Sequence, residues 1–213
     1  MEKEIADKNL FMICRNLNFE ATSELPAEYH IRNCKREELD IWMEFPFDSP
    51  KEAKKNKQFM KNYFEEVYGG KRDKFFKKCK FVCNRQDSPV ATGFTWKAYD
   101  KITTIHWLKV LKKYEGMGIG RALLSRIMLN LSEEDYPVFL HTHPGSYRAI
   151  KLYSDFGFYL SEDPVIGSRE NHLKEALPYL REKMPDEVYE NLKTTTAPDD
   201  FLNIVGSAPT IEF

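Results

Sequence analysis

Three glycines at alternating positions, Gly116, Gly118 and Gly120, are the residues whose type and spacing most plainly suggest chemistry. Because glycine has no Cβ atom, such a stretch lets backbone N–H groups approach a ligand that side chains would otherwise block. Residues 102–111 form an apolar, β-branched run, and residues 122–131 repeat apolar side chains at helical spacing, so the glycines lie where a strand gives way to a helix. The unbonded amides and the positive dipole end of a helix start attract anions. The pattern predicts a site for a phosphate or pyrophosphate.

Two common nucleotide loops do not fit this spacing. A P-loop requires Lys-Ser/Thr after its last glycine, and neither residue follows Gly120. The dinucleotide fingerprint is Gly-x-Gly-x-x-Gly, whereas the chain has Gly-x-Gly-x-Gly. Both are disfavoured, and the alternative to a phosphate site is an ordinary glycine-rich turn.

The elements that must position this loop follow from hydrophobic periodicity and from turn residues. In chain order we expect a strand at 29–32, helices at 35–45, 51–68 and 73–78, a hairpin at 80–84 and 89–96, the strand and helix around the glycines, a strand at 136–142 and a helix at 146–158. Ser146 would cap that last helix and Gly157 would end it.

The two ends of the chain are less regular. The apolar stretch 10–14 is predicted to be a helix end or an added edge strand. After residue 163 we expect helices near 172–183 and 186–193 and a linker at 194–200. Residues 201–205 would then form a last strand or, alternatively, part of a surface tail.

Composition limits the class of protein. The chain has 213 residues with 42% hydrophobic residues, enough for one domain with a real core. The net charge of −1 argues against general nucleic-acid binding, although residues 51–80 carry eleven Lys/Arg against four Asp/Glu, a run that is usually a solvated helix face. The start is charged and no apolar run reaches the roughly eighteen residues of a membrane span. We therefore expect a cytoplasmic monomer or homodimer with no membrane partner.

Cysteine and metal chemistry are not expected. Cys14, Cys34, Cys79 and Cys83 lack paired Cys-x-x-Cys spacing, so reduced buried thiols are favoured over disulfides or zinc. We assign no metal.

Two motifs resemble those of the GNAT (GCN5-related) N-acetyltransferases. Leu108, Val110, Gly118 and Gly120 match the acetyl-CoA loop pattern Leu-x-Val, spacer, Gln/Arg-x-x-Gly-x-Gly/Ala. The chain departs from that pattern at Glu115, where Gln or Arg is usual, and at Lys112, where Pro is common.

The second motif, Asn-x-x-Ala-x-x-x-Tyr followed by Gly-Phe, lies about 30 residues later. Ala149, Tyr153, Gly157 and Phe158 match it, and Ser146 replaces the Asn. Together the motifs cover roughly residues 29–162.

This resemblance implies an α/β (α+β) fold, with a mixed, mostly antiparallel sheet of six to seven strands and helices on both faces. Residues 1–28 would be an N-terminal extension and 29–162 the acetyl-CoA-binding core. Residues 163–213 would add a helical elaboration, with a possible closing strand, to the same domain.

The resemblance also implies an acetyl-CoA-dependent transferase, in which the amine of a small molecule or peptide attacks the thioester directly. A non-catalytic acyl-CoA-binding or regulatory module is the alternative, favoured by Glu115, Ser146 and the absence of a strand carboxylate at Thr104, where some relatives carry a base.

Each site residue has an implied or inferred role. Tyr153 occupies the family's general-acid position, and His106 shares a strand face with Thr104 and is the candidate base. The main chain at Val110, freed by a local bulge, would hold the pantetheine amide. The expected cofactor-binding residues are Leu108, Val110, Gly116, Met117, Gly118, Ile119, Gly120, Arg121 and Ser146.

Overall fold

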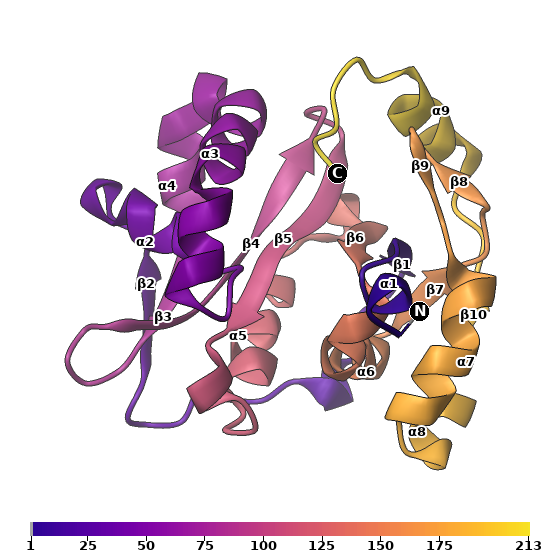
Figure 1. Cartoon of the computed structure of the whole chain (residues 1–213), viewed down its shortest axis with the longest axis horizontal. Helices are drawn as coiled ribbons and strands as arrows, with labels where there is room; N and C mark the ends of the chain where they lie inside the picture. The colour runs from indigo at the N-terminus through magenta and orange to yellow at the C-terminus, as the bar shows by residue number, and fades with distance from the viewer. Residues whose placement is uncertain (1) are drawn as a thin grey trace. The chain divides into compact units, whose positions relative to one another are not determined.

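Two long strands, β4 (Pro89–Ala98) and β5 (Ile102–Val110), run through both of the units into which the chain divides (Figure 1). The computed structural model describes residues 2–213. The first unit comprises Met1–Ala21, Lys97–Thr104 and Ser132–Phe213, and the second comprises Thr22–Trp96 and Ile105–Leu131.

The strands of the first unit lie in the order β10, β7, β1, β6 and β5. Their bounds are β1 Leu10–Cys14, β6 Val138–Thr142, β7 Phe158–Ser161 and β10 Thr194–Thr195. Strand β1 pairs antiparallel with both β6 and β7, while β5 is parallel to β6 at Thr103 and Thr104 and β10 is parallel to β7.

The prediction that residues 10–14 end a helix or form an edge strand is wrong. Strand β1 has a partner on each side, and all five of its residues are buried. A strand enclosed in this way reads as a continuous apolar run, Leu-Phe-Met-Ile-Cys, rather than as an alternating one. Because the run does not alternate, its periodicity could not identify it as an interior strand.

The first unit also contains five helices and a short hairpin among its described residues. They are α1 Glu2–Ala6, α6 Tyr147–Asp155, α7 Leu173–Lys183, α8 Asp186–Glu190, α9 Asp199–Ser207, and the strands β8 Val165–Ile166 and β9 Arg169–Glu170. The expected helices near 172–183 and 186–193 are confirmed as α7 and α8.

The predicted strand at 201–205 is wrong, because these residues lie in helix α9. Phe201 and Val205, four residues apart, are buried on one helix face. The ring of Phe201 stacks on Phe139 with centroids 3.9 Å apart. Part of the expected linker instead extends the sheet, since Thr194 and Thr195 form β10.

The strands of the second unit lie in the order β5, β4, β3 and β2. Strand β2 (His30–Asn33) is antiparallel to β3 (Lys80–Cys83), which is antiparallel to β4, so the predicted hairpin is confirmed. Its helices are α2 Leu39–Glu44, α3 Pro50–Val67, α4 Arg72–Lys78 and α5 Ile119–Met128. Helix α3 begins where Ser49 Oγ accepts a hydrogen bond from the Glu52 amide.

Neighbouring residues of β4 show that helices cover both faces of the second unit's strands. A Cβ atom at Gly93 would lie 3.4 Å from Ile127 of α5. The next residue, Phe94, points to the opposite face, where its ring packs on Tyr68 and Phe75. We call the buried rings on that face the aromatic cluster: Trp42, Phe64, Tyr68, Phe75, Phe94 and Trp96.

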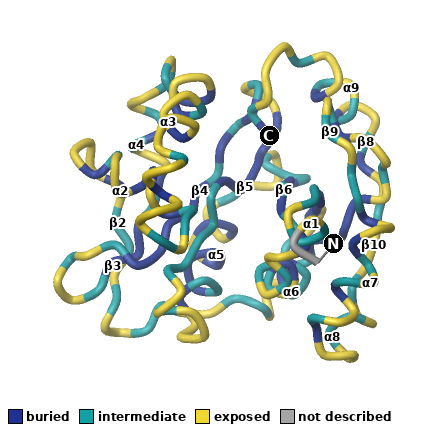
Figure 2. The backbone as a smooth tube through the Cα atoms, in the orientation of Figure 1, coloured by how far each residue is buried: buried dark blue, intermediate teal, exposed yellow. Residues whose placement is uncertain are grey.

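The main sheet has eight strands, one or two more than expected, with the mixed and mostly antiparallel pairing that was predicted. Figure 2 shows buried backbone along β1, β4 and β6 and exposed positions along α3. Within residues 2–213, no helix combines the length and apolar character that a membrane crossing requires.

Candidate functional site

The glycine loop joins β5 to α5 through a short 3-10 turn, Lys112–Tyr114. Gly116 and Gly118 adopt φ values of 78° and 77°, a left-handed conformation that residues with a Cβ atom rarely occupy. A Cβ atom built on either glycine would meet nothing within 4 Å. The absence of side chains therefore leaves open space above this stretch of backbone.

The start of α5 presents amides that the helix itself does not use. Gly118 is the N-cap and supplies no side-chain cap, and its carbonyl accepts from the Ala122 amide at 3.0 Å. The amides of Ile119 and Gly120 precede that bond in the first turn, where a helix supplies no acceptor for them. Ile119 is buried and anchors the first turn. This arrangement can bind an anion through main-chain N–H groups.

Two side chains border this loop within the second unit. Met117 is 49% exposed, and its sulfur accepts a hydrogen bond from the Tyr29 hydroxyl at 3.6 Å. Glu115 is exposed at the loop entrance and would repel an anion that approached its carboxylate. The backbone amides are thus the loop's groups best suited to a pyrophosphate.

Strand β5 changes character at Trp107. Residues Ile102 to His106 are buried, whereas Trp107 to Val110 are only half-buried. Trp107 has a φ of 52°, uncommon for a non-glycine residue and disruptive of regular pleating. This irregularity lies three residues before Val110, the position where a bulge was expected. The Leu111 amide then donates a hydrogen bond to Val90 O at 2.9 Å.

His106 forms a hydrogen bond that no sequence pattern predicts. Its Nδ1 lies 2.5 Å from the Tyr68 hydroxyl, and His106 is 6% exposed while Tyr68 is fully buried. Tyr63 and Trp107 also engage the Tyr68 side chain through hydrogen bonds. Tyr68 lies 38 residues before His106, and no local motif marks it.

The surroundings of Tyr68 keep its hydroxyl neutral. Burial raises the pKa of Tyr68 well above its ordinary value, and the neighbouring Tyr63 raises it further. The indole N–H of Trp107 can only donate, so the Tyr68 oxygen accepts from it. Tyr68 therefore holds the His106 ring in one orientation, with Nδ1 engaged.

Tyr153 lies in the first unit on α6. It is 6% exposed, its ring centroid is 5.8 Å from that of Phe158, and its hydroxyl donates no hydrogen bond to any described residue. Burial raises the pKa of Tyr153, so the phenol stays protonated through the neutral range. A proton donor without a protein acceptor is available to a ligand.

Gly157 ends α6 as predicted, with φ at 93°. Its amide donates to Ser154 O at 3.0 Å. The predicted capping role of Ser146 is wrong: Ser146 occupies the N-cap position, but its side chain makes no cap hydrogen bond, and its backbone lies in the 3-10 turn Pro144–Ser146.

In the part of the chain that the structure describes, two groups of side chains bring possible metal ligands within 4.8 Å of one another. In the second unit His30, Cys83 and Asp87 meet, but Asp87 already binds Arg32 and Lys35, whose charges oppose a cation. In the first unit the group is Glu170, His172 and Glu175, and both of its carboxylates are mostly exposed.

All four cysteines are free and buried, which confirms the prediction of reduced thiols. Burial raises the pKa of Cys83 to about 11 and that of Cys14 to about 12. These thiols are therefore poor nucleophiles at neutral pH.

Solved structures with a similar course of the chain include several GNAT proteins. A GNAT-family acetyltransferase from Staphylococcus aureus Mu50 is 16% identical, with 60% of this chain and 81% of that one covered and a TM-score of 0.46. A GNAT-family protein from Novosphingobium aromaticivorans is 11% identical, with 72% and 60% covered and a TM-score of 0.46. A GCN5-related N-acetyltransferase from Sphaerobacter thermophilus is 15% identical, with 63% and 42% covered and a TM-score of 0.44.

No curated protein matches the sequence. The model of the acetyltransferase (GNAT) family matches residues 37–158, more than half of the chain and the region that carries the glycine loop, β5 and α6. The chain therefore belongs to the GNAT acetyltransferase family.

Proposed function

We propose that this protein transfers an acetyl group from acetyl-CoA to a primary amine of a small molecule or peptide. The observation that carries the proposal is the open, amide-lined glycine loop before α5, within the region that matches the family model. Acetyl-CoA would supply the activated thioester when bound.

The chain's residues would bind the cofactor mainly through main-chain groups. The amides from Gly116 to Arg121 would hold the pyrophosphate, because they lie at the start of α5, at the positive end of its dipole. Leu108 and the main chain of Val110, on the half-buried part of β5, would hold the pantetheine arm. Ser146 would be a further contact for the cofactor.

Two side chains would move protons. His106 would take the proton of the attacking amine, held in orientation by its bond to Tyr68. As the new C–N bond forms and the C–S bond breaks, Tyr153 would give its phenolic proton to the leaving thiolate. Its unbonded hydroxyl supports that role.

The test is product formation by the purified full chain with acetyl-CoA and a panel of primary amines, followed by mass spectrometry of the acetylated amine. Thiol release alone is insufficient, because hydrolysis also produces it. Gly118→Ala should weaken acetyl-CoA binding, because a side chain would enter the open loop and strain the left-handed residue. Lys55→Gln, on an exposed position of α3, is the matched control.

The outcomes separate the proposal from the non-catalytic alternative. Binding of acetyl-CoA without any acetylated amine would favour an acyl-CoA-binding module, for which the exposed Glu115 at the loop entrance is the specific argument. Failure of the folded protein to bind either acetyl-CoA or CoA would contradict both.

A further inference from the structure

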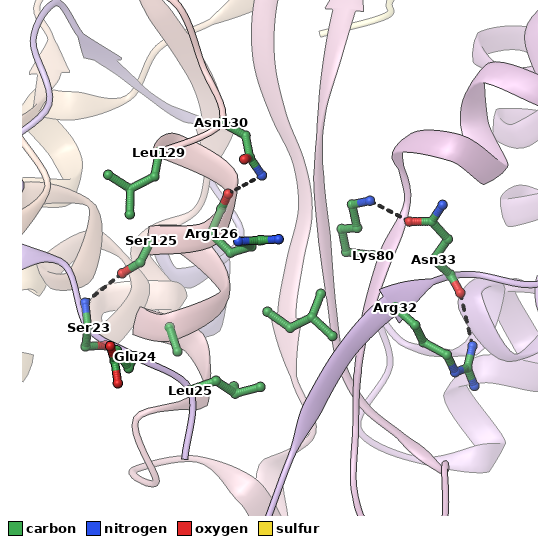
Figure 3. Close-up of a pocket in the computed structure, with 12 residues that line it drawn as sticks. Ser23, Glu24, Leu25, Arg32, Asn33, Lys80, Ser125, Arg126, Leu129 and Asn130 are labelled. Atoms are coloured by element: carbon green, nitrogen blue, oxygen red, sulfur yellow. Dashed lines mark hydrogen bonds between the residues drawn. The ribbon is translucent and has the colours of Figure 1, made fainter. Parts of the chain in front are cut away.

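The second unit contains a pocket of about 510 Å³ on the flank of α5 (Figure 3). The α5 residues that line the pocket begin at Ala122, beyond the amides of the glycine loop. The remaining walls come from β2, the start of β3 and the extended segment 23–25. Its volume is in the usual range for small-molecule sites, roughly 300–1,000 Å³.

Hydrogen bonds attach one wall of the pocket to the helix. The amide of Ser23 donates to Ser125 Oγ at 2.9 Å, and Ser125 Oγ donates to Arg121 O at 2.8 Å. The segment 23–25 is thereby fastened to α5. Apolar side chains contribute part of the lining: Leu25, Ile31, Ala122 and Leu129.

Three cations line the pocket, and only one of them is neutralised. Arg32 donates to both carboxylate oxygens of Glu38 at 2.7 Å and to Asp87 at 2.7 Å. Lys80 donates instead to a neutral acceptor, Asn33 Oδ1, at 2.5 Å. Arg126 forms no ion pair with any described side chain.

The charges of Lys80 and Arg126 influence each other. Burial, followed by the charges of Lys78 and Arg126, lowers the pKa of Lys80. Figure 3 shows Arg126 entering from α5 and Lys80 from β3 on the opposite side. Glu24 is the only carboxylate among the lining residues, and Arg32 is paired with carboxylates outside the lining. Lys80, Arg126 and Glu24 therefore leave the pocket a net charge of about +1.

We propose that this pocket binds a small organic monocarboxylate with an apolar tail. The carboxylate would be held by Lys80 and Arg126 through charge-assisted hydrogen bonds, and the tail would lie against Leu25, Ile31 and Leu129. A monoanion matches the single uncompensated charge, whereas a phosphate dianion would leave excess negative charge beside Glu24. This site is separate from the proposed acetyl-transfer residues.

The experiment measures binding of sodium acetate, butyrate and hexanoate to the purified full chain by calorimetry at low ionic strength. Each buried methylene contributes about 0.8 kcal/mol, so affinity should rise about fourfold per methylene from acetate to hexanoate. Lys80→Gln and Arg126→Gln should each weaken hexanoate binding about tenfold or more. Lys55→Gln should leave it unchanged.

A second measurement does not depend on the variants. Side-chain NMR of Lys80 should show its pKa rising when hexanoate binds, because an anion favours the charged ammonium form. Acetyl-CoA at saturation should leave hexanoate binding intact, which separates this pocket from the proposed cofactor loop.

Several results would overturn the proposal. They are no carboxylate binding at millimolar concentration, binding that neither substitution weakens, inorganic phosphate binding as tightly as hexanoate, or displacement of hexanoate by acetyl-CoA.

Discussion

Replacing Tyr68 with Phe removes one hydroxyl from the centre of the aromatic cluster and leaves the ring in place. The change deletes the 2.5 Å bond to His106 Nδ1 and the bonds to Tyr63 and Trp107. Because His106 is only 6% exposed, water cannot easily replace the lost partner. An unsatisfied buried polar group costs about 1–3 kcal/mol, so the free energy of unfolding should fall by that amount.

The same substitution should change the pH dependence of the proposed reaction. When His106 is protonated, its Nδ1–H must donate, and the Tyr68 oxygen is the acceptor. Hydrogen bonds to charged groups contribute about 1 kcal/mol more than neutral ones, so the variant destabilises protonated His106 more than neutral His106. The acidic limb of the profile of kcat/KM should therefore move to lower pH by roughly one unit.

The assay combines urea unfolding at neutral pH with rates of amine acetylation between about pH 5 and 9. This interval brackets the unperturbed pKa of a histidine side chain, about 6.5. Tyr159→Phe is the matched control, because the Tyr159 hydroxyl makes no hydrogen bond with a described residue and the side chain is half-buried. An unaltered unfolding midpoint for Tyr68→Phe would refute the hydrogen-bond argument. Normal destabilisation with an unmoved acidic limb would remove His106 as the base.

Three further predictions concern single positions. Tyr153→Phe should lower kcat by roughly 10²-fold, measured by steady-state rates, while calorimetry should find the acetyl-CoA affinity nearly unchanged. An unchanged kcat would exclude Tyr153 as the general acid. Gly157→Ala should lower the free energy of unfolding by more than the roughly 1–2 kcal/mol that a left-handed backbone costs a residue with a side chain, since its Cβ atom would lie 2.6 Å from Asn16 O. Urea unfolding measures this change, and a smaller loss of stability would contradict the contact. Ellman's reagent at pH 8 should label no cysteine in the native protein and all four in denaturant, because all four thiols are buried and burial also raises the pKa of Cys83 to about 11. Rapid labelling of the native protein would count against their burial.

Sequence patterns predicted best those parts of the fold that depend on neighbouring residues. The hairpin from Lys80 to Ala98 alternates and is bounded by turn residues, so its strands were expected within two residues of their observed ends. The glycine loop belongs to the same class, because its φ values and exposed amides depend on residue type within a few positions. Backbone sites of this kind can be inferred from a short stretch of sequence.

Features that depend on distant pairing were not predicted. The interior position of β1 requires knowing that two strands far along the chain flank it. Residues 201–205 are a short apolar run that periodicity alone assigns to either strand or helix, and their packing on Phe139 decides for the helix. Likewise the bond from Tyr68 to His106 and the meeting of Lys80 with Arg126 arise from the register of separate elements.

Gly118 and Gly157 show why a shared conformation does not imply a shared role. Both have a positive φ, at 77° and 93°, so both resist a side chain for the same local reason. A Cβ at Gly157 would collide with the backbone of Asn16, whereas one at Gly118 would meet nothing within 4 Å. Packing therefore explains glycine at position 157. At position 118 only the dihedral and the open space remain as reasons, and that space, next to unused amides, is where an anionic ligand would lie.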